Sequence, residues 1–359
     1  MAAGADVLVC TSPENVAYTT GFVVPSQPLM RWRHAATILA ADGRQAMVCV
    51  DMEETAVREA LGDLDLTVWR EFGGSAMRAI ADVLARFGMA SSRIALERSF
   101  LPVRDFEELR SYLPGADFCA GDQLLSECRR FKTPAELDLI ERLSRIADGA
   151  IAACYKEVKV GSTEMDMAAM LTRAVYEGGA QQFKLMIVAT GERSQLANVG
   201  PTERSLKRGD VCRVEIFPVI NGYHAGVCRT GVVGDPPPHT EQVYQNLLEC
   251  RQLVLEAARP GVPARKVYEV FRAKFDELGM PPISFVGHGI GLDLHEPPYL
   301  ADFDTTVLAP GMVLGVEPLV YRTGYGFGMQ IKDMIAIEEH GARVLSGPAG
   351  TAASLRIAV

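Results

Sequence analysis

From residue 134 onward, the chain repeats one order of elements: two helices and then a run of strands. Apolar residues recur at helical spacing over 134–158, 163–178, 243–258 and 264–278. Strand-forming runs dominate residues 183–234 after the first pair of helices and residues 283–346 after the second pair. The order of two helices followed by strands therefore occurs twice in this region.

Shorter elements alternate in the preceding part of the chain. Residues 5–10 are predicted to form a buried strand, and the following segment, Thr11-Ser12-Pro13-Glu14-Asn15, is predicted to be a turn. Residues 35–40 and 45–50 flank Ala41-Asp42-Gly43-Arg44, which is a hairpin signal. Further elements are expected as helices over 53–61, 75–87 and 103–113 and a strand over 93–97. Strands that alternate with helices in this way predict an α/β domain.

A helix start marks the transition between the two regions. In Phe131-Lys132-Thr133-Pro134-Ala135-Glu136, Thr133 is a suitable N-cap, Pro134 suits the first helical position, and Glu136 follows in the first turn. We therefore predict an N-terminal domain over residues 1–125 and a second domain over residues 126–359.

Charge and composition restrict the class of protein. The formal net charge of −9 argues against nucleic acid as the main partner. The sequence contains no uninterrupted run of about 18 apolar residues, so no membrane-spanning helix is expected. The first residues lack the pattern of a secretory leader. The eight cysteines form no CxxC pair, which is typical of reduced thiols. These features agree with a soluble enzyme and predict a cytoplasmic location.

Five segments carry most of the chemistry-bearing residues. Their sequences are Glu215-Ile-Phe-Pro-Val-Ile-Asn-Gly-Tyr-His-Ala-Gly-Val-Cys-Arg-Thr230, Gly287-His-Gly-Ile-Gly291, His295-Glu-Pro297, Gly311-Met-Val-Leu-Gly-Val-Glu-Pro318 and Met329-Gln-Ile-Lys-Asp333. Together they resemble the motifs of the creatinase, aminopeptidase P and prolidase family, and the resemblance covers nearly the whole chain. It implies an α+β fold: a pita-bread catalytic domain, with helices over a curved antiparallel sheet and pseudo-twofold halves, behind a smaller α/β domain.

The resemblance also identifies what is missing. Metal-dependent members of the family hold two metal ions with five side chains, and the matching positions here are Glu215, Gly226, His288, Glu317 and Lys332. Gly226 has no side chain, and Lys332 carries an ammonium in place of a carboxylate. Two divalent ions about 3.5–4 Å apart need bridging carboxylates, so we expect no binuclear site and no cofactor. The alternative is one divalent metal ion on Glu215, His288 and Glu317.

Without a metal, the same positions suggest acid–base chemistry. Glu215 is expected to attack the substrate or to act as a base, while His288 and His295 are expected to move protons. Glu317 would orient the substrate, and Lys332 would stabilise developing negative charge.

The resemblance places further residues around the substrate. Arg33 matches an arginine that, in creatinase, reaches across the dimer to hold the substrate carboxylate, so a homodimer is expected. Asn198 stands where creatinase has a proton-shuttling histidine, and an asparagine can only form hydrogen bonds. Cys228 is either an inert strand thiol or a nucleophile. Tyr223 and Gln330 complete the predicted substrate-binding residues, while Arg229 is expected to form a structural ion pair.

These observations predict a metal-independent hydrolase of a C–N bond in a small carboxylated substrate, such as a creatine-like amidine, an ectoine-like ring or an amide. On this interpretation the chain is closer to the creatinase-like and ectoine-hydrolase-like members than to the metal-dependent Xaa-Pro peptidases. One alternative is an Xaa-Pro dipeptidase-like enzyme with a reduced metal site. Another is a non-catalytic member of the fold that binds peptides or protein partners.

Overall fold

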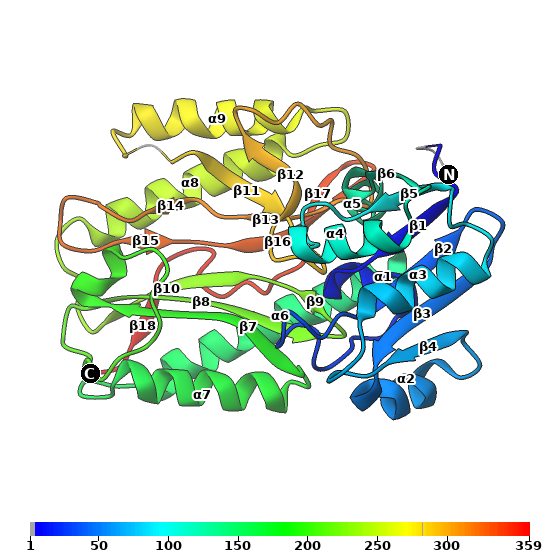
Figure 1. The fold of residues 1–359 in the computed structure, drawn as a ribbon. Coiled ribbons are helices and arrows are strands. Elements are labelled where there is room, and N and C mark those ends of the chain that lie inside the picture. Colours follow the sequence, from blue (N-terminus) through cyan, green and yellow to red (C-terminus); the bar gives the residue numbers. More distant parts are fainter. Residues whose placement is uncertain (1–3, 282) are drawn as a thin grey trace. The chain divides into compact units, whose positions relative to one another are not determined.

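The computed structural model describes residues 4–281 and 283–359. The chain divides into two compact units, one that ends at Arg129 and one that runs from Arg130 to Val359 (Figure 1). The boundary predicted between residues 125 and 126 falls inside helix α5 (Asp122–Arg130), and the division comes at the end of that helix. Within the part of the chain that the structure describes, none of the helices has the length and apolar character that crossing a membrane requires.

The first unit is built on a six-stranded sheet with the strand order β4-β3-β2-β1-β5-β6. Its strands are β1 (Val7–Cys10), β2 (Ala36–Ala40), β3 (Gln45–Val50), β4 (Leu66–Trp69), β5 (Arg93–Leu96) and β6 (Asp117–Ala120). Its helices are α1 (Pro13–Thr20), α2 (Glu54–Leu61), α3 (Ala76–Arg86), α4 (Val103–Tyr112) and α5, with the 3-10 turn η1 (Asp51–Glu53). Strands β2 and β3 form the predicted antiparallel hairpin, and β1, β5 and β6 pair in parallel, so the predicted α/β architecture is confirmed.

The predicted turn after β1 is wrong, because helix α1 begins there. Ser12 caps it, with its hydroxyl accepting a hydrogen bond from the backbone N–H of Asn15 at 3.1 Å, and Pro13 takes the first helical position. The carboxylate of Glu97 accepts hydrogen bonds from the backbone N–H groups of Thr11 and Ser12. A partner 85 residues away in the sequence from Ser12 therefore helps to hold the start of this helix.

The second unit contains the repeated order of helices and strands that the sequence predicts. Helices α6 (Pro134–Glu157) and α7 (Glu164–Glu177) precede β7 (Gln182–Thr190), the 3-10 segment η2 (Gly191–Gln195), β8 (Val211–Ile220), β9 (Tyr223–His224) and β10 (Val227–Val233). Helices α8 (Thr240–Ala257) and α9 (Ala264–Glu277) precede β11 (Phe285–Gly289), β12 (Glu296–Ala301), β13 (Val313–Val316), β14 (Leu319–Val320), β15 (Met329–Gln330), β16 (Asp333–Glu338) and β17 (Gly341–Val344). The last strand is β18 (Leu355–Ile357), which pairs with β10.

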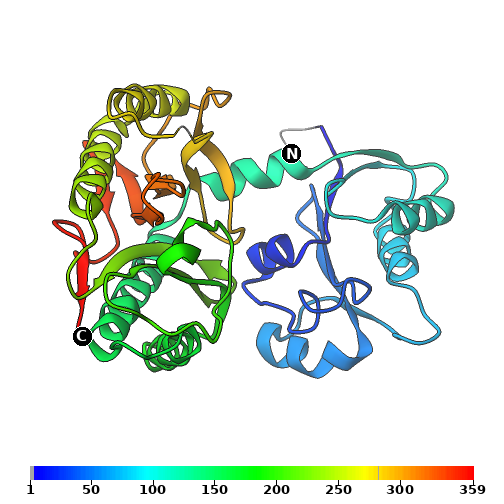
Figure 2. The ribbon, with the colours of Figure 1, turned by 90° about the vertical axis from the view of Figure 1, so that its left-hand side faces the viewer.

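These strands form two five-stranded sheets and one short pair. The first sheet has the order β18-β10-β8-β7, with β9 paired to β8, and the second has the order β12-β11-β13-β16-β17. Figures 1 and 2 show the pair α6 and α7 and the pair α8 and α9 on the outside of these strands. The pita-bread architecture with pseudo-twofold halves is therefore confirmed.

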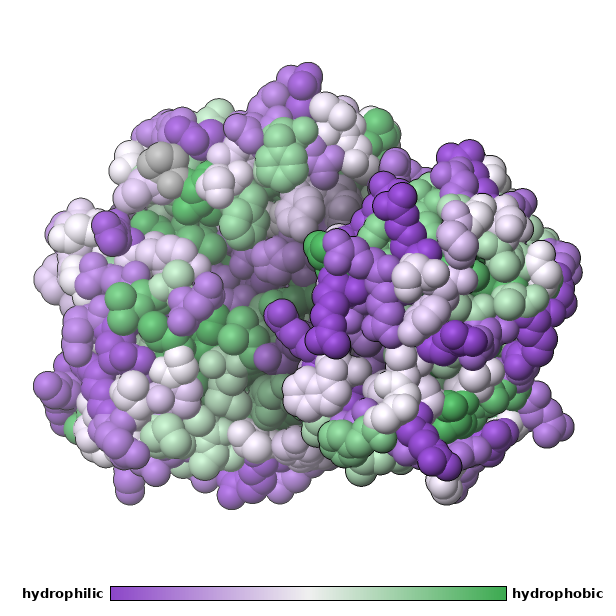
Figure 3. Space-filling model, viewed as in Figure 1, coloured by the Kyte–Doolittle hydropathy of each residue, from purple (hydrophilic) through white to green (hydrophobic). Residues whose placement is uncertain are grey.

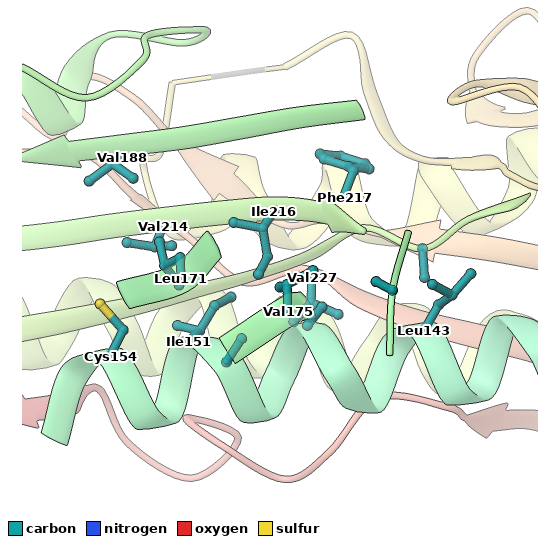
Figure 4. Close-up of a cluster of buried hydrophobic side chains, with 14 of the residues drawn as sticks. Leu143, Ile151, Cys154, Leu171, Val175, Val188, Val214, Ile216, Phe217 and Val227 are labelled. Atoms are coloured by element: carbon teal, nitrogen blue, oxygen red, sulfur yellow. The ribbon is translucent and has the colours of Figure 1, made fainter. Parts of the chain in front are cut away.

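Local signals explain where the first pair of helices begins. Thr133 caps α6 and Thr163 caps α7, each in a capping box closed by an acidic residue three positions later. Helix α6 then packs along the sheet, and its Leu143, Ile151 and Cys154 belong to the same buried cluster as Val214 and Ile216 of β8 (Figure 4). On the face of this unit that Figure 3 shows, hydrophobic side chains gather over the strands between the two helix pairs.

All eight cysteines are free thiols, and all but Cys119 and Cys128 are buried. This agrees with the sequence-based interpretation of reduced, mostly buried cysteines.

Candidate active site

The alternation of strand β8 places three side chains in a row. Arg213, Glu215 and Phe217 are two residues apart in the same strand and share one face, while Val214 and Ile216 lie on the other face; Phe217 belongs to the same buried hydrophobic cluster as Val214 and Ile216. Figure 4 shows Ile216 and Phe217 pointing to opposite sides of β8. This row is an arginine, a carboxylate and an aromatic ring, all of them buried.

Lys332 lies at the centre of the candidate residues. Its Nζ is 3.2 Å from Glu215 Oε1, 3.2 Å from Glu317 Oε2 and 3.1 Å from His288 Nε2. The side chain is 1% exposed. An ammonium has three N–H donors and no acceptor, and three acceptors surround it. The structure therefore brings together four of the five residues predicted to be catalytic.

The backbone explains how distant segments meet there. Glu215 in β8 pairs with Cys228 in β10, and Cys228 forms an isolated bridge with Lys332. His288 in β11 pairs with Gly315 in β13, and Glu317 follows β13 directly. The motif spacing in the sequence thus corresponds to neighbouring positions on adjacent strands.

One hydrogen bond identifies the proton-bearing nitrogen of His288. Nδ1 lies 2.8 Å from the carbonyl oxygen of Gly289, which can only accept. We therefore assign the proton to Nδ1 and the lone pair to Nε2, which accepts from Lys332. Nε2 is also 3.1 Å from Glu317 Oε1, a buried oxygen that accepts no hydrogen bond from the described residues. A proton taken up by Nε2 would form a hydrogen bond to that oxygen.

The charges of this cluster stabilise one another. Burial lowers the pKa of Lys332, but the carboxylates of Glu317 and Glu215 outweigh it, and the pKa ends above its usual value. Burial raises the pKa of Glu317, and the nearby Lys332 ammonium more than compensates, so the pKa ends below its usual value. Lys332 is therefore a cation, and Glu317 is an anion, at neutral pH.

Phe217 fills the space beside Gly226, a position at which the sequence predicts a missing metal ligand. A Cβ atom on Gly226 would lie 2.2 Å from Cε1 of the Phe217 ring, far inside van der Waals contact. The same ring has its centroid 4.8 Å from Nζ of Lys332, in cation–π range. One aromatic ring therefore lies against both Gly226 and Lys332, the two positions at which the sequence predicts lost ligands.

His295 completes the predicted catalytic set. Its ring stacks on that of His288, with 3.6 Å between centroids and 9° between planes. His295 is exposed, whereas His288 is buried. Partial burial, together with the neighbouring His288 and Lys332, lowers the pKa of His295 to about 4. His295 is therefore neutral at pH 7 and connects the buried cluster to the surface of this unit.

Sequence reasoning missed Arg213. This residue is fully buried, and its guanidinium donates to Oε1 of Gln330 at 3.0 Å and lies 3.9 Å from Glu215 Oε2. The amide of Gln330 in turn donates to Glu317 Oε2 at 3.1 Å. A charged residue two positions from Glu215 in an otherwise apolar strand is the signal that could have identified it.

The other predicted substrate-binding residues have different surroundings. Gln330 is a buried member of the cluster, whereas Asn198 is exposed in the segment after η2. The Tyr223 hydroxyl donates to Glu136 on helix α6 at 2.7 Å. Burial raises the pKa of the Cys228 thiol well above its usual value, which argues against a nucleophilic role.

Arg33 lies in the first unit and already has a carboxylate partner. Its guanidinium donates two hydrogen bonds to Glu71, at 2.7 and 2.9 Å, and Trp32 donates a third at 3.1 Å. Its predicted role in holding a substrate across a dimer stays a prediction.

Arg229 forms the structural ion pairs that the sequence suggested. Its buried guanidinium contacts Asp148 at 2.7 Å and Asp333 at 2.8 Å.

The residues present do not fit a divalent metal. In residues 4–281 and 283–359, no three histidine, cysteine, aspartate or glutamate side chains are arranged to hold one. Glu215, His288 and Glu317 converge on the Lys332 ammonium. The two buried cations, Lys332 and Arg213, also balance the two carboxylates, so the cluster has no excess negative charge to attract a metal ion.

Comparison with known proteins identifies the family. The model for metallopeptidase family M24 matches residues 138–339, and that for the creatinase/prolidase N-terminal domain matches residues 1–131. The Xaa-Pro dipeptidase of Pyrococcus furiosus is 32% identical over 69% of this chain and 71% of its own length.

Solved structures agree with this match. The prolidase of Pyrococcus horikoshii superposes with a TM-score of 0.85 at 25% identity, covering 96% of this chain and 95% of its own. Dipeptidase PepE of Mycobacterium ulcerans gives a TM-score of 0.85 at 26% identity, covering 100% and 95%. These relatives are dipeptidases and prolidases, so the predicted closeness to creatinase-like members stays a prediction. The chain belongs to metallopeptidase family M24, as a hydrolase that joins a creatinase/prolidase N-terminal domain to the catalytic domain of that family.

Proposed function

We propose that the chain hydrolyses the C–N bond of a small carboxylated amide, similar in size to a dipeptide, without a metal ion. The observation that carries this proposal is the place of Lys332 Nζ, within about 3.2 Å of Glu215, Glu317 and His288. An ammonium at this centre supplies fixed positive charge where relatives of the family are expected to use metal ions. The names of the relatives support a dipeptide-type substrate.

The side chains provide the groups that such a reaction needs. Glu215 takes a proton from water, or attacks the carbonyl carbon itself, and the Lys332 ammonium stabilises the negative charge that develops on the carbonyl oxygen. To bind that oxygen, Lys332 must redirect one of its three N–H donors from its present acceptors. The proton that Glu215 takes from water reaches His288 Nε2 through Lys332 Nζ, which lies between Glu215 Oε1 and Nε2. His288, with His295 stacked on it, then delivers that proton to the departing nitrogen as the C–N bond breaks.

The relatives favour a second candidate, an Xaa-Pro dipeptidase with one metal ion on Glu215, His288 and Glu317. It requires the Lys332 side chain to leave the centre that it occupies, or to lose its proton and coordinate the metal. The neighbouring carboxylates oppose that loss, because they hold the pKa of Lys332 above its usual value.

Treatment with a chelator is expected to leave turnover unchanged. The protein, purified without chelators, would be analysed for bound metal by mass spectrometry and assayed on Xaa-Pro dipeptides, creatine and ectoine. Metal far below one ion per chain, with the same rate before and after chelation, supports the proposal. One removable ion per chain whose loss abolishes hydrolysis would establish the second candidate. No turnover on any substrate, with peptide binding retained, would favour the non-catalytic alternative.

A further inference from the structure

A buried guanidinium holds the backbone of the segment that follows η2. The Nη2 atom of Arg213 donates to the carbonyl oxygens of Leu196 and Ala197, the latter at 2.7 Å. The side chains of this segment face outward: Leu196 is 46% exposed, and Asn198 is exposed beside it. The exposed loop at Leu196–Asn198 is therefore held by hydrogen bonds from the completely buried side chain of Arg213.

The other side of the same guanidinium belongs to the catalytic cluster. Nη1 donates to Gln330 Oε1 at 3.0 Å and lies 3.9 Å from Glu215 Oε2. Through Gln330, whose amide donates to Glu317 at 3.1 Å, the contact extends to the second carboxylate. One planar group thus connects the loop at Leu196–Ala197 with both catalytic glutamates.

A second loop touches the face of this group. The Tyr321 ring, just after β14, has its centroid 5.1 Å from Cζ of Arg213. Stacking on one face and hydrogen bonds at the edge use the two features that distinguish arginine from lysine. A lysine could keep the charge, but it could not donate to two carbonyl groups and Gln330 in one plane.

We propose that Arg213 is a positioning residue that fixes the loop carrying Asn198 relative to Glu215 and Glu317, so that contacts of the amide substrate with this loop set the orientation of the two carboxylates. This inference rests on the proposed function for the identity of the reaction. It assigns Arg213 a role in positioning the two carboxylates in addition to balancing their charge.

Arg193 provides a matched control at the other end of the same loop. Its Nη2 donates to the carbonyl oxygen of Gly200 at 2.8 Å, and its Nε pairs with Glu164 at 3.1 Å. None of its described hydrogen bonds or ion pairs involves Glu215, Gln330 or Glu317. Loosening the loop from this end should therefore leave the carboxylates in place.

The test compares Arg213→Lys with Arg193→Lys in the full-length protein. Both variants should show faster amide hydrogen exchange over residues 195–200. Arg213→Lys should also reduce kcat by about 10²-fold, the effect expected of a displacement near 1 Å, and raise KM. Arg193→Lys should raise KM while keeping kcat within about twofold of the wild type, because the carboxylates keep their partners.

Gln330→Met adds a readout that does not require the loop to move. It breaks the link from Arg213 to Glu317, so kcat should fall while exchange over 195–200 stays as in the wild type. Equal kcat for the two arginine variants, or a lower kcat for Arg213→Lys with unchanged exchange, would overturn the inference. If the wild type requires a metal, the proposed metal-free reaction is wrong, and the same comparison is run with that metal supplied. The result then tests the role of Arg213 separately from the proposed function.

Discussion

Replacing Lys332 by methionine is expected to destabilise the protein by about 3–5 kcal/mol and to reduce turnover by about 10²–10³-fold. The ammonium is the shared partner of Glu215 and Glu317, and both carboxylates are nearly inaccessible to water. Methionine fills a similar volume but leaves two buried negative charges with only Arg213 to compensate them. Urea unfolding followed by circular dichroism measures the stability change, and steady-state kinetics measures the change in turnover.

A second substitution separates charge from shape. Glu317→Gln in the Lys332→Met background removes one of the two uncompensated charges, so the double variant should regain part of the lost stability. Its turnover should stay low, because the cation at the centre of the site is still absent. A double variant no more stable than Lys332→Met would show that the loss comes from packing rather than from charge.

Lys132 offers a matched control in the same unit. It forms a buried pair with Glu296 at 3.0 Å, and both side chains are almost completely buried. Lys132→Met should therefore lower the stability by a comparable amount while the folded protein keeps its turnover. Wild-type stability of Lys332→Met, or equal losses of turnover in the two variants, would contradict the central place given to Lys332.

Local signals explain why much of the fold was predictable. The sequence around Thr133 contains a cap, a proline and an acidic residue, and α6 begins there with all three in use. Ser12 and Pro13 present a similar signal, yet a turn was predicted. What the local sequence could not show is the long-range contribution of Glu97, whose carboxylate accepts from Thr11 and Ser12.

The candidate site was predictable only where motif positions were compared one by one. The motif positions lie on neighbouring strands of the structure, and this is why the comparison could identify Glu215, His288, Glu317 and Lys332. Arg213 and Phe217 were missed, although both share the face of β8 that carries Glu215. Comparison of motifs considers only the expected ligand positions. The residues two positions before and after Glu215 are recognised as neighbours only when the side chains on one face of the strand are considered together.

The surroundings of Lys332 explain how this chain places an ammonium where metal-dependent members of the family are expected to hold metal ions. A lysine alone at position 332 would face two carboxylates with an unbalanced negative charge. Arg213 supplies the second positive charge, and the Phe217 ring, in the space that a side chain at position 226 would need, covers the ammonium. These positions form one unit, and changing one of them alone should be unfavourable.

Gly226→Asp by itself is therefore expected to destabilise the protein by at least about 1–3 kcal/mol and to gain no metal. The new Cβ would collide with the Phe217 ring, whose Cε1 is 2.2 Å away, and overpacking a core has a penalty of this size. The added carboxylate would also lack a partner, because Lys332 is already surrounded by its own acceptors.

Changing all three positions together should have the opposite effect on metal binding. The triple variant Phe217→Ala, Gly226→Asp, Lys332→Glu removes the ring and the ammonium and adds two carboxylates beside Glu215, His288 and Glu317, which provides the bridging groups that two divalent ions require. Titration calorimetry with Mn²⁺ should show stoichiometric binding to this variant and none to the wild type. Lys332→Glu alone is the control, since it removes the ammonium but leaves Phe217 and the missing side chain at position 226. If the wild type bound Mn²⁺ as tightly as the triple variant, the ammonium would not be what keeps metal out of the site.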